Sequence, residues 1–130
     1  MILIDTSAWV EFLRDTGSPT CERVDSLLGS DIATCDMIRM EVLAGARDEH
    51  HLGSLRRLLA RAVSLPTMPA NYELGAALYR RCRHRGETVR KMVDCLIASI
   101  AIHSGATLLH RDADFDVLER HTELAVDRHG

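Results

Sequence analysis

The chain has 130 residues, of which 46% are hydrophobic, and a formal net charge of −3 at pH 7. That length is typical of one domain with one sizeable core, so we expect a single domain over residues 1–130. The charge does not indicate a strongly basic nucleic-acid-binding protein, and no apolar run approaches the roughly 18 residues of a membrane span. Met1 leads directly into apolar residues 2–4 without a basic segment, which predicts a cytoplasmic protein without a signal peptide.

The first half of the chain alternates short apolar segments with helical patterns. The apolar residues 2–4 are followed by a polar run from Asp5, so we expect a buried strand that ends there. Asp36 is expected to cap a helix that Gly45 closes. In order, the sequence predicts a strand at residues 2–4, helices at 8–14 and 21–28, a strand at 32–34, and helices at 36–44 and 48–61.

The second half repeats this alternation. We expect a weak strand at residues 63–65, a helix that Asn71 caps and Gly86 ends, a helix from 92 to 105, a strand at 107–109 and a short last strand at 124–126. The segment from Met92 to Ile102 is apolar on nearly every side, which is typical of a helix in the middle of a domain.

Asp94 is the one formally charged residue between Lys91 and Arg111. A buried carboxylate without a partner is costly, so the sequence predicts that Asp94 is neutral, paired or bound to a cation. The alternative is a helix cap, because aspartate is favoured near helix N-termini, where it accepts backbone N–H bonds.

Strands that alternate with helices predict an α/β fold with a parallel sheet covered on both faces. Ligands of such sheets bind beyond the carboxyl ends of the strands. Asp5 and Asp112 each follow a strand, and Asp94 opens a helix at the same edge. Glu41 lies opposite Arg39 on its helix and is expected to face inward, unless the helix is rotated and Glu41 pairs on the surface. Four carboxylates from remote segments are therefore predicted to converge.

Converging carboxylates repel one another and need compensation. Oxygen ligands with no cysteine or histidine nearby favour Mg²⁺ or Mn²⁺ over zinc. A cation held there binds phosphate oxygens and lowers the pKa of water, which is the chemistry of phosphodiester cleavage. Basic residues precede Asp94, and we expect Arg85, Arg90 and Lys91 to hold a nucleic-acid backbone. A solvated helix face is the alternative for this basic cluster.

Four segments resemble, in order and spacing, the motifs of the PIN-domain family: ILIDTS at residues 2–7, MEVLAG at 40–45, VDCLIA at 93–98 and LLHRDADF at 108–115. The likeness spans essentially the whole chain and is strongest to the VapC toxins of VapBC toxin–antitoxin modules. It implies a three-layer α/β/α sandwich with strand order 3-2-1-4-5. It also implies a Mg²⁺-dependent endoribonuclease, with Mn²⁺ as a substitute, that cuts structured RNA such as tRNA or an rRNA loop. A homodimer and a cognate VapB-type antitoxin are the implied partners.

Carried over by position, the resemblance implies that Asp5 and Asp94 are the principal metal ligands and that Glu41 and Asp112 complete a catalytic pocket. The hypothesis for the reaction is attack of activated water on the phosphorus in line with the leaving oxygen, with a carboxylate as proton acceptor. Family analogy then implies a 5′-phosphate and a 3′-hydroxyl at the cut.

Five further residues surround these positions. Thr6 or Ser7 is expected to orient Asp5 or a water. Asp114 or Asp116 is close enough in sequence to share the role of Asp112. His110 stands where the family often has a hydroxyl residue, and we interpret it as a bystander rather than a group that reaches the substrate.

Rival functions fit less well. A haloacid-type phosphatase requires a second aspartate two residues after Asp5, where this chain has Ser7, and a receiver domain requires a lysine late in the chain, whereas Lys91 is the only one. The remaining alternative is a catalytically inactive PIN-like module that binds RNA or a protein. A module of that kind is expected to have lost a carboxylate, and this chain retains all of them.

Overall fold

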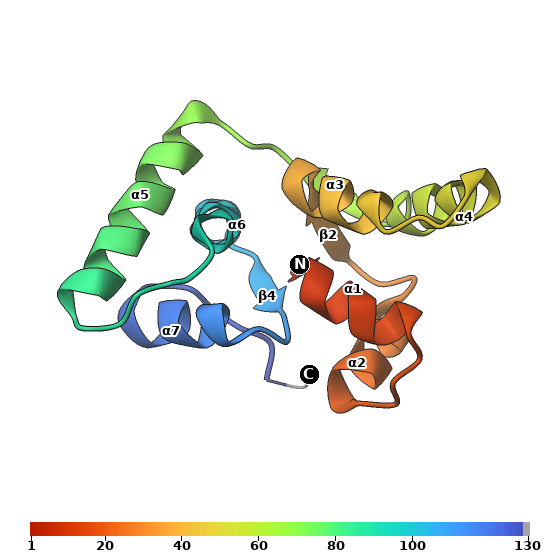
Figure 1. Cartoon of the computed structure of the whole chain (residues 1–130), viewed down its shortest axis with the longest axis horizontal. Helices are drawn as coiled ribbons and strands as arrows, with labels where there is room; N and C mark the ends of the chain where they lie inside the picture. Colours follow the sequence, from red (N-terminus) through yellow and green to blue (C-terminus); the bar gives the residue numbers. More distant parts are fainter. Residues whose placement is uncertain (129–130) are drawn as a thin grey trace.

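The computed structural model describes residues 1–128 (Figure 1). Its elements follow the predicted alternation except for one helix, Ala113–His121, that the sequence analysis did not predict. In chain order they are β1 (Ile2–Ile4), α1 (Thr6–Leu13), α2 (Pro19–Leu27), β2 (Ile32–Cys35), α3 (Asp36–Ala44), α4 (Glu49–Leu59), β3 (Val63–Leu65), α5 (Pro69–His84), α6 (Met92–Ser104), β4 (Thr107–Leu109) and α7 (Ala113–His121).

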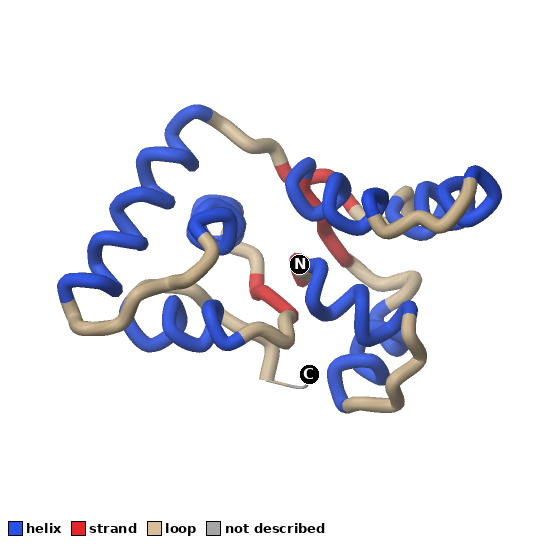
Figure 2. The backbone as a smooth tube through the Cα atoms, in the orientation of Figure 1, coloured by secondary structure: helices blue, strands red, loops and turns tan. Residues whose placement is uncertain are grey.

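The strands form one parallel sheet in the order β3-β2-β1-β4, which confirms the α/β class and the predicted order of these strands (Figure 2). The expected fifth strand at residues 124–126 is reduced to a bridge between Leu108 and Val126. The Leu108 N–H donates to the carbonyl of Ala125 at 2.9 Å, and the Asp127 N–H donates to the carbonyl of Leu108 at 2.8 Å. With one bridged residue pair, this segment lies beside β4 without extending into a strand.

Helices cover both faces of the sheet, as the α/β/α sandwich requires. Helices α1 to α4 lie on one side and α5 to α7 on the other (Figure 1). The chain passes from β1 to β2 and β3 and then returns to the far side of β1 for β4. Because crossovers between parallel strands are right-handed, this reversal places the later helices on the opposite face. The reversal between β1 and β4 is the switch point at which ligands of open sheets bind.

Helix α6 forms the centre of the second helical layer. Every residue from Asp94 to Ala101 is buried, as the apolar sequence predicted. It packs against α5 at Gly75, where an added Cβ would lie 3.4 Å from the backbone of Cys95 and Leu96. The close approach of these helices fixes where α6 begins, and therefore where Asp94 lies.

Two predicted helix caps were wrong. Helix α5 begins at Pro69, and Asn71 is its third residue, with a side-chain oxygen that accepts the Met68 N–H at 2.7 Å. Helix α3 begins at Asp36, and Cys35 occupies the cap position. Within the described residues, no helix has the length and apolar character that a membrane crossing requires.

Candidate metal centre

The predicted carboxylates reach one edge of the sheet from separate elements. Asp5 follows β1 and caps α1, and Asp112 follows β4 and caps α7. Asp94 lies in the first turn of α6. Burial is the main cause of the raised pKa of both Asp94 and Glu41, and repulsion from the charges of Asp112 and Asp5 adds to each shift. The structure brings Asp94 and Asp112 into one group of carboxylates, to which Asp5 and Glu41 do not belong although their charges act on it.

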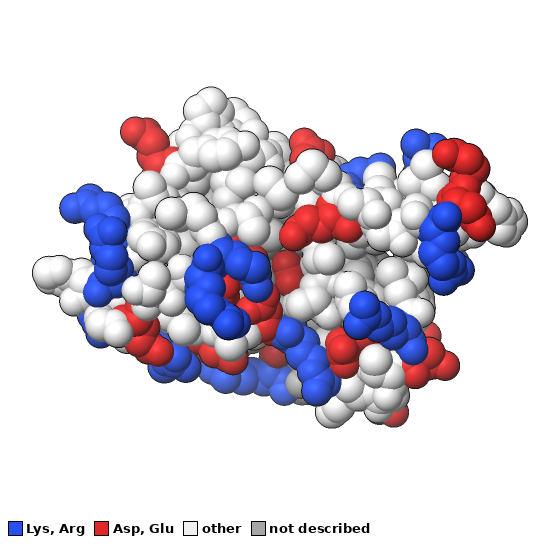
Figure 3. Space-filling view, viewed as in Figure 1, with Lys and Arg blue, Asp and Glu red and all other residues white. Residues whose placement is uncertain are grey.

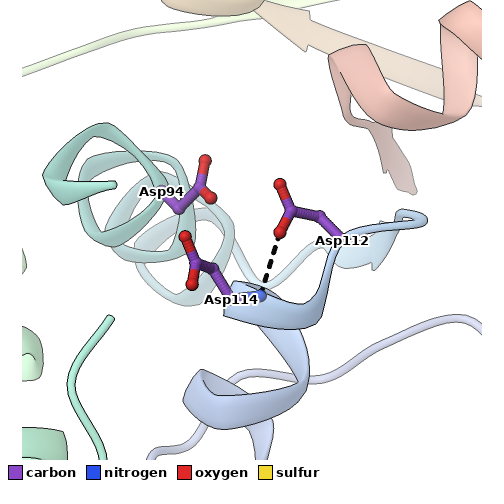
Figure 4. A group of neighbouring side chains, drawn as sticks. All are labelled: Asp94, Asp112 and Asp114. Carbon is purple, nitrogen blue, oxygen red and sulfur yellow. Dashed lines mark hydrogen bonds between the residues drawn. The ribbon is translucent and has the colours of Figure 1, made fainter. Parts of the chain in front are cut away.

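The tightest group consists of Asp94, Asp112 and Asp114, each of which offers a carboxylate oxygen within 4.8 Å of the others. Figure 4 shows Asp94 on α6 facing the two aspartates at the start of α7. Asp94 and Asp114 are 4% and 2% exposed. Because Mg²⁺ holds oxygens at about 2.1 Å, ligands on opposite sides of one ion lie about 4.2 Å apart. The spacing therefore suits a single small cation after a slight contraction.

Ser7 holds Asp5 in place. Its N–H and its hydroxyl both donate to Asp5 Oδ2, at 2.9 and 2.6 Å. The Ser7 hydroxyl also accepts the Arg111 N–H at 2.9 Å, which joins the ends of β1 and β4. Burial raises the pKa of Asp5, and the Ser7 hydrogen bonds oppose that shift without cancelling it. Of the two residues expected to orient Asp5, Ser7 makes the contact.

Glu41 lies at the rim of the site rather than inside it. Its side chain is exposed, contrary to the expected inward position, and accepts a hydrogen bond from the Thr6 hydroxyl at 2.9 Å. Partial desolvation still raises the pKa of Glu41, with the Thr6 hydrogen bond opposing and the Asp5 charge adding to the shift. The rim position follows from the sheet, because α3 starts after β2, one strand away from the switch point.

Asp94 has the buried oxygen that a cation would satisfy. Among the described residues, no hydrogen bond reaches Asp94 Oδ2 although that atom is buried. Burial, followed by repulsion from Asp112 and Asp5, raises the pKa of Asp94 to about 8. The nearest cationic group to this oxygen is the Lys91 ammonium at 3.5 Å, and the carboxylate belongs to a group of three that offers only oxygen ligands. This donor set fits a hard divalent cation.

Lys91 lies beside the acidic site as expected, but its ammonium pairs with the carboxylates, which the sequence did not predict. Its Nζ lies 2.5 Å from Asp112 Oδ2, 3.5 Å from Asp94 Oδ2 and 3.7 Å from Asp114 Oδ2. The hydrogen bond to Asp112 raises the pKa of the Lys91 ammonium. Burial alone would raise the pKa of Asp112, but the Lys91 hydrogen bond and charge bring it below its ordinary value. The one available signal was a lone lysine three residues before Asp94.

Asp114 anchors the loop before α6. Its two oxygens accept the backbone N–H groups of Arg90 and Lys91 at 3.1 and 3.0 Å. Asp116 is exposed and lies 3.8 Å from His110 Nε2, outside the cluster. His110 Nδ1 accepts the Asp112 N–H at 3.1 Å, so this imidazole supports the backbone beside the site. Asp114, and not Asp116, therefore adjoins Asp112 and Asp94.

The basic residues divide into two groups. The Lys91 ammonium lies among the carboxylates, whereas the Arg90 side chain is 75% exposed, with Nε 3.6 Å from Asp114 Oδ1. Arg85 is exposed at the end of α5. Figure 3 shows acidic side chains near the middle of this face, partly covered by Lys and Arg side chains.

The sandwich and the acidic switch point are shared by a defined class of α/β domains. A PIN-domain sequence profile matches residues 2–120, so the chain belongs to the PIN-domain family.

Within this family the chain is similar to VapC ribonucleases. It is 49% identical over 128 residues to Ribonuclease VapC11 of Mycobacterium tuberculosis H37Rv, which covers 95% of this chain and 96% of that protein. It is 35% identical over 119 residues to Ribonuclease VapC32 of the same strain, with 86% and 85% covered.

Solved structures show the same fold. The VapBC2 complex of Rickettsia felis bound to a promoter DNA fragment matches with a TM-score of 0.78 at 20% identity, over 98% of each chain. VapC20 of Mycobacterium tuberculosis, described as a toxin that cleaves the sarcin–ricin loop, matches with a TM-score of 0.65 at 18% identity, over 89% of this chain and 93% of that one.

Proposed function

We propose that this chain is the toxin of a VapBC-type toxin–antitoxin module and acts as a Mg²⁺-dependent endoribonuclease on structured RNA. The observation that carries the proposal is the buried carboxylate of Asp94, which lies with Asp112 and Asp114 at the switch point and has one oxygen that accepts no hydrogen bond. The similarity to VapC ribonucleases supports the choice of RNA as substrate.

Asp5, Asp94 and Asp112 are the residues that would hold the cation, with Glu41 completing the pocket from its rim. A bound Mg²⁺ or Mn²⁺ would neutralise charge on the phosphoryl oxygens and lower the pKa of water. Ser7 fixes the carboxylate of Asp5 through its two hydrogen bonds. Asp114 fixes the loop that carries Lys91 through its backbone hydrogen bonds, and its carboxylate lies close enough to Asp94 and Asp112 to share the cation with them.

A side chain of the protein can accept the proton that the attacking water loses during hydrolysis. A water oxygen bonds to phosphorus and gives up one proton, the bond from phosphorus to the 3′ oxygen breaks, and the 3′ oxygen takes a proton from solvent. Glu41 is exposed to solvent, held by Thr6 and raised in pKa, which suits a carboxylate that takes the water proton. The products carry a 5′-phosphate and a 3′-hydroxyl.

The RNA backbone would lie over the basic residues beside the pocket. Arg90 is largely exposed and adjoins Asp114, and Arg85 is exposed nearby in sequence, so both are available for phosphate. We assign the substrate to the tRNA or rRNA-loop class, which places the activity in the cytoplasm.

The antitoxin would bind beside Glu41. A cavity of about 370 Å³ lies among α1, α3 and α4 and includes Glu41 in its wall. Apart from Thr6 and Gly45, its other lining residues are apolar or basic: Val10, Leu13, Arg14, Val42, Arg47, His51 and Leu55. Leu13 is exposed. A VapB-type segment with apolar side chains and carboxylates would complement this wall.

A second copy of the chain would cover another surface. Met40, Tyr72 and Met92 are large apolar residues that are more than half exposed. Met40 and Tyr72 line one small cavity with Leu96, which lies one helical turn after Met92. Burial of this patch in a homodimer would remove it from water.

The test is cleavage of total cellular RNA by the purified protein with Mg²⁺ or Mn²⁺, with EDTA and Asp94→Asn as controls. We expect discrete fragments with 5′-phosphates that disappear in both controls. Fragments that end in 2′,3′-cyclic phosphate would contradict the mechanism. Metal binding without any cleavage, even by antitoxin-free protein on tRNA and rRNA, would favour the inactive binding module.

A further inference from the structure

Lys91 places one ammonium where three candidate metal ligands meet. The Oδ2 atoms of Asp112, Asp94 and Asp114 lie 2.5, 3.5 and 3.7 Å from its Nζ. The same three aspartates form the group whose oxygens suit one cation. The ammonium and a divalent ion therefore compete for the same oxygens.

The chemistry of lysine suits this position. Its ammonium is a compact charge with donors that turn freely, whereas the guanidinium of arginine is a planar fork. Lys91 is the only lysine in the sequence, which otherwise uses arginine for its permanently charged basic residues. A compact ammonium can approach several carboxylates at once, as a metal ion does.

The backbone holds Lys91 while its side chain remains able to move. The Lys91 N–H donates to Asp114 Oδ2 at 3.0 Å, and the residue is the N-cap of α6. The side chain is 50% exposed, so its route to solvent is open. The ammonium can leave the carboxylates by rotation about side-chain bonds alone.

We propose that Lys91 is a tethered counter-ion of the metal centre. Its ammonium neutralises the carboxylates while the site holds no metal, and it swings outward when a divalent cation binds. The inference rests on the proposed metal site. Two effects of opposite sign follow, because Lys91 stabilises the metal-free protein and opposes the entry of the metal.

The first test is calorimetric titration of the full-length protein with Mn²⁺, comparing Lys91→Met with the wild type. Methionine keeps the apolar stem and removes the charge. We expect the dissociation constant to fall by roughly threefold to tenfold, since half-exposed ion pairs are of modest strength. Arg83→Gln is the charge-matched control, because the Arg83 guanidinium lies 5.5 Å from the ring centre of Tyr79 on α5 rather than in the pocket. Unchanged or weaker Mn²⁺ binding by Lys91→Met would overturn the proposal.

The second test is the melting temperature of the same variants in EDTA and in saturating Mn²⁺. Lys91→Met should melt below the wild type in EDTA and regain the difference in Mn²⁺, and Lys91→Gln should behave alike. Equal melting in EDTA would overturn the counter-ion role. If neither protein binds Mn²⁺, the metal site itself fails, whereas equal binding by both removes only the proposal for Lys91.

Discussion

At the scale of single residues, the site combines buried carboxylates with few compensating charges. Asp94 shows this most clearly, because its pKa is raised to about 8 from an ordinary value of 3.8. Between these values the folded protein binds a proton at Asp94 that the unfolded chain releases. The metal-free protein therefore loses stability from this group as pH rises from about 4 to 8.

Asp94→Asn removes this dependence. In EDTA at pH 9 we expect the variant to be more stable than the wild type by on the order of 1 kcal/mol, because a desolvated, repelled charge is gone. At pH 4 the two proteins should unfold alike, since Asp94 is then neutral. Thermal unfolding followed by circular dichroism at both pH values measures the difference. A variant that is less stable than the wild type at pH 9 would contradict this account of Asp94.

Ser7→Ala tests the residue that positions Asp5. The change removes the 2.6 Å hydrogen bond to Asp5 and the acceptor of the Arg111 N–H. We expect a loss of about 1–2 kcal/mol in the free energy of unfolding and a Mn²⁺ affinity about tenfold weaker. Thr6→Ala is the matched control, because Thr6 contacts the exposed Glu41 and should leave stability nearly unchanged. Equal effects of the two changes would contradict the role of Ser7.

At the scale of elements, the packing of α5 on α6 positions the site. Gly75 lies against the backbone of α6. A Cβ added at Gly75 would lie 3.4 Å from backbone atoms of Cys95 and Leu96. These residues directly follow Asp94, so a displacement of α6 also moves the carboxylate. The apolar sequence predicted a buried α6, but nothing in it predicted which face α5 would cover.

Gly75→Val should therefore reduce both stability and metal binding. Overpacking of this contact is expected to cost about 1–3 kcal/mol in the free energy of unfolding. Gly53→Ala on α4 is the control, because its Cβ would meet only the flexible Arg57 side chain at 3.5 Å, and alanine favours the helix. Urea denaturation of both variants gives the comparison. Full stability and full Mn²⁺ affinity in Gly75→Val would show that α6 is held by other contacts.

In the molecule as a whole, the order of the strands determines which site residues could be located from the sequence alone. Asp5 and Asp112 follow strands, and the rule that ligands bind beyond strand ends located both. The exposed position of Glu41 was not predicted, because the polarity of α3 leaves the rotation of that helix ambiguous. The side chain of Lys91 was not predicted either, since its direction depends on carboxylates from α6 and α7 that only the fold brings together.

The exposed arginine beside the pocket allows a prediction of how RNA binding depends on salt concentration. Arg90 is 75% exposed beside the pocket, so Arg90→Gln should weaken RNA binding about equally for all sequences. The slope of log affinity against log salt should decrease in magnitude by about 1. Filter binding across a salt series, with the catalytically disabled Asp94→Asn background to prevent cleavage, measures this slope. An unchanged slope would place the RNA on another face.

The proposed activity depends on a divalent cation held by the carboxylates at the switch point. A crystal structure of the protein soaked with Mn²⁺, with anomalous diffraction to locate the ion, tests it most directly. We predict one anomalous peak or two adjacent peaks contacting Asp5, Asp94 and Asp112, with the Lys91 ammonium moved outward. No anomalous peak at these residues, with Lys91 still bound to Asp112 at saturating Mn²⁺, would contradict the account.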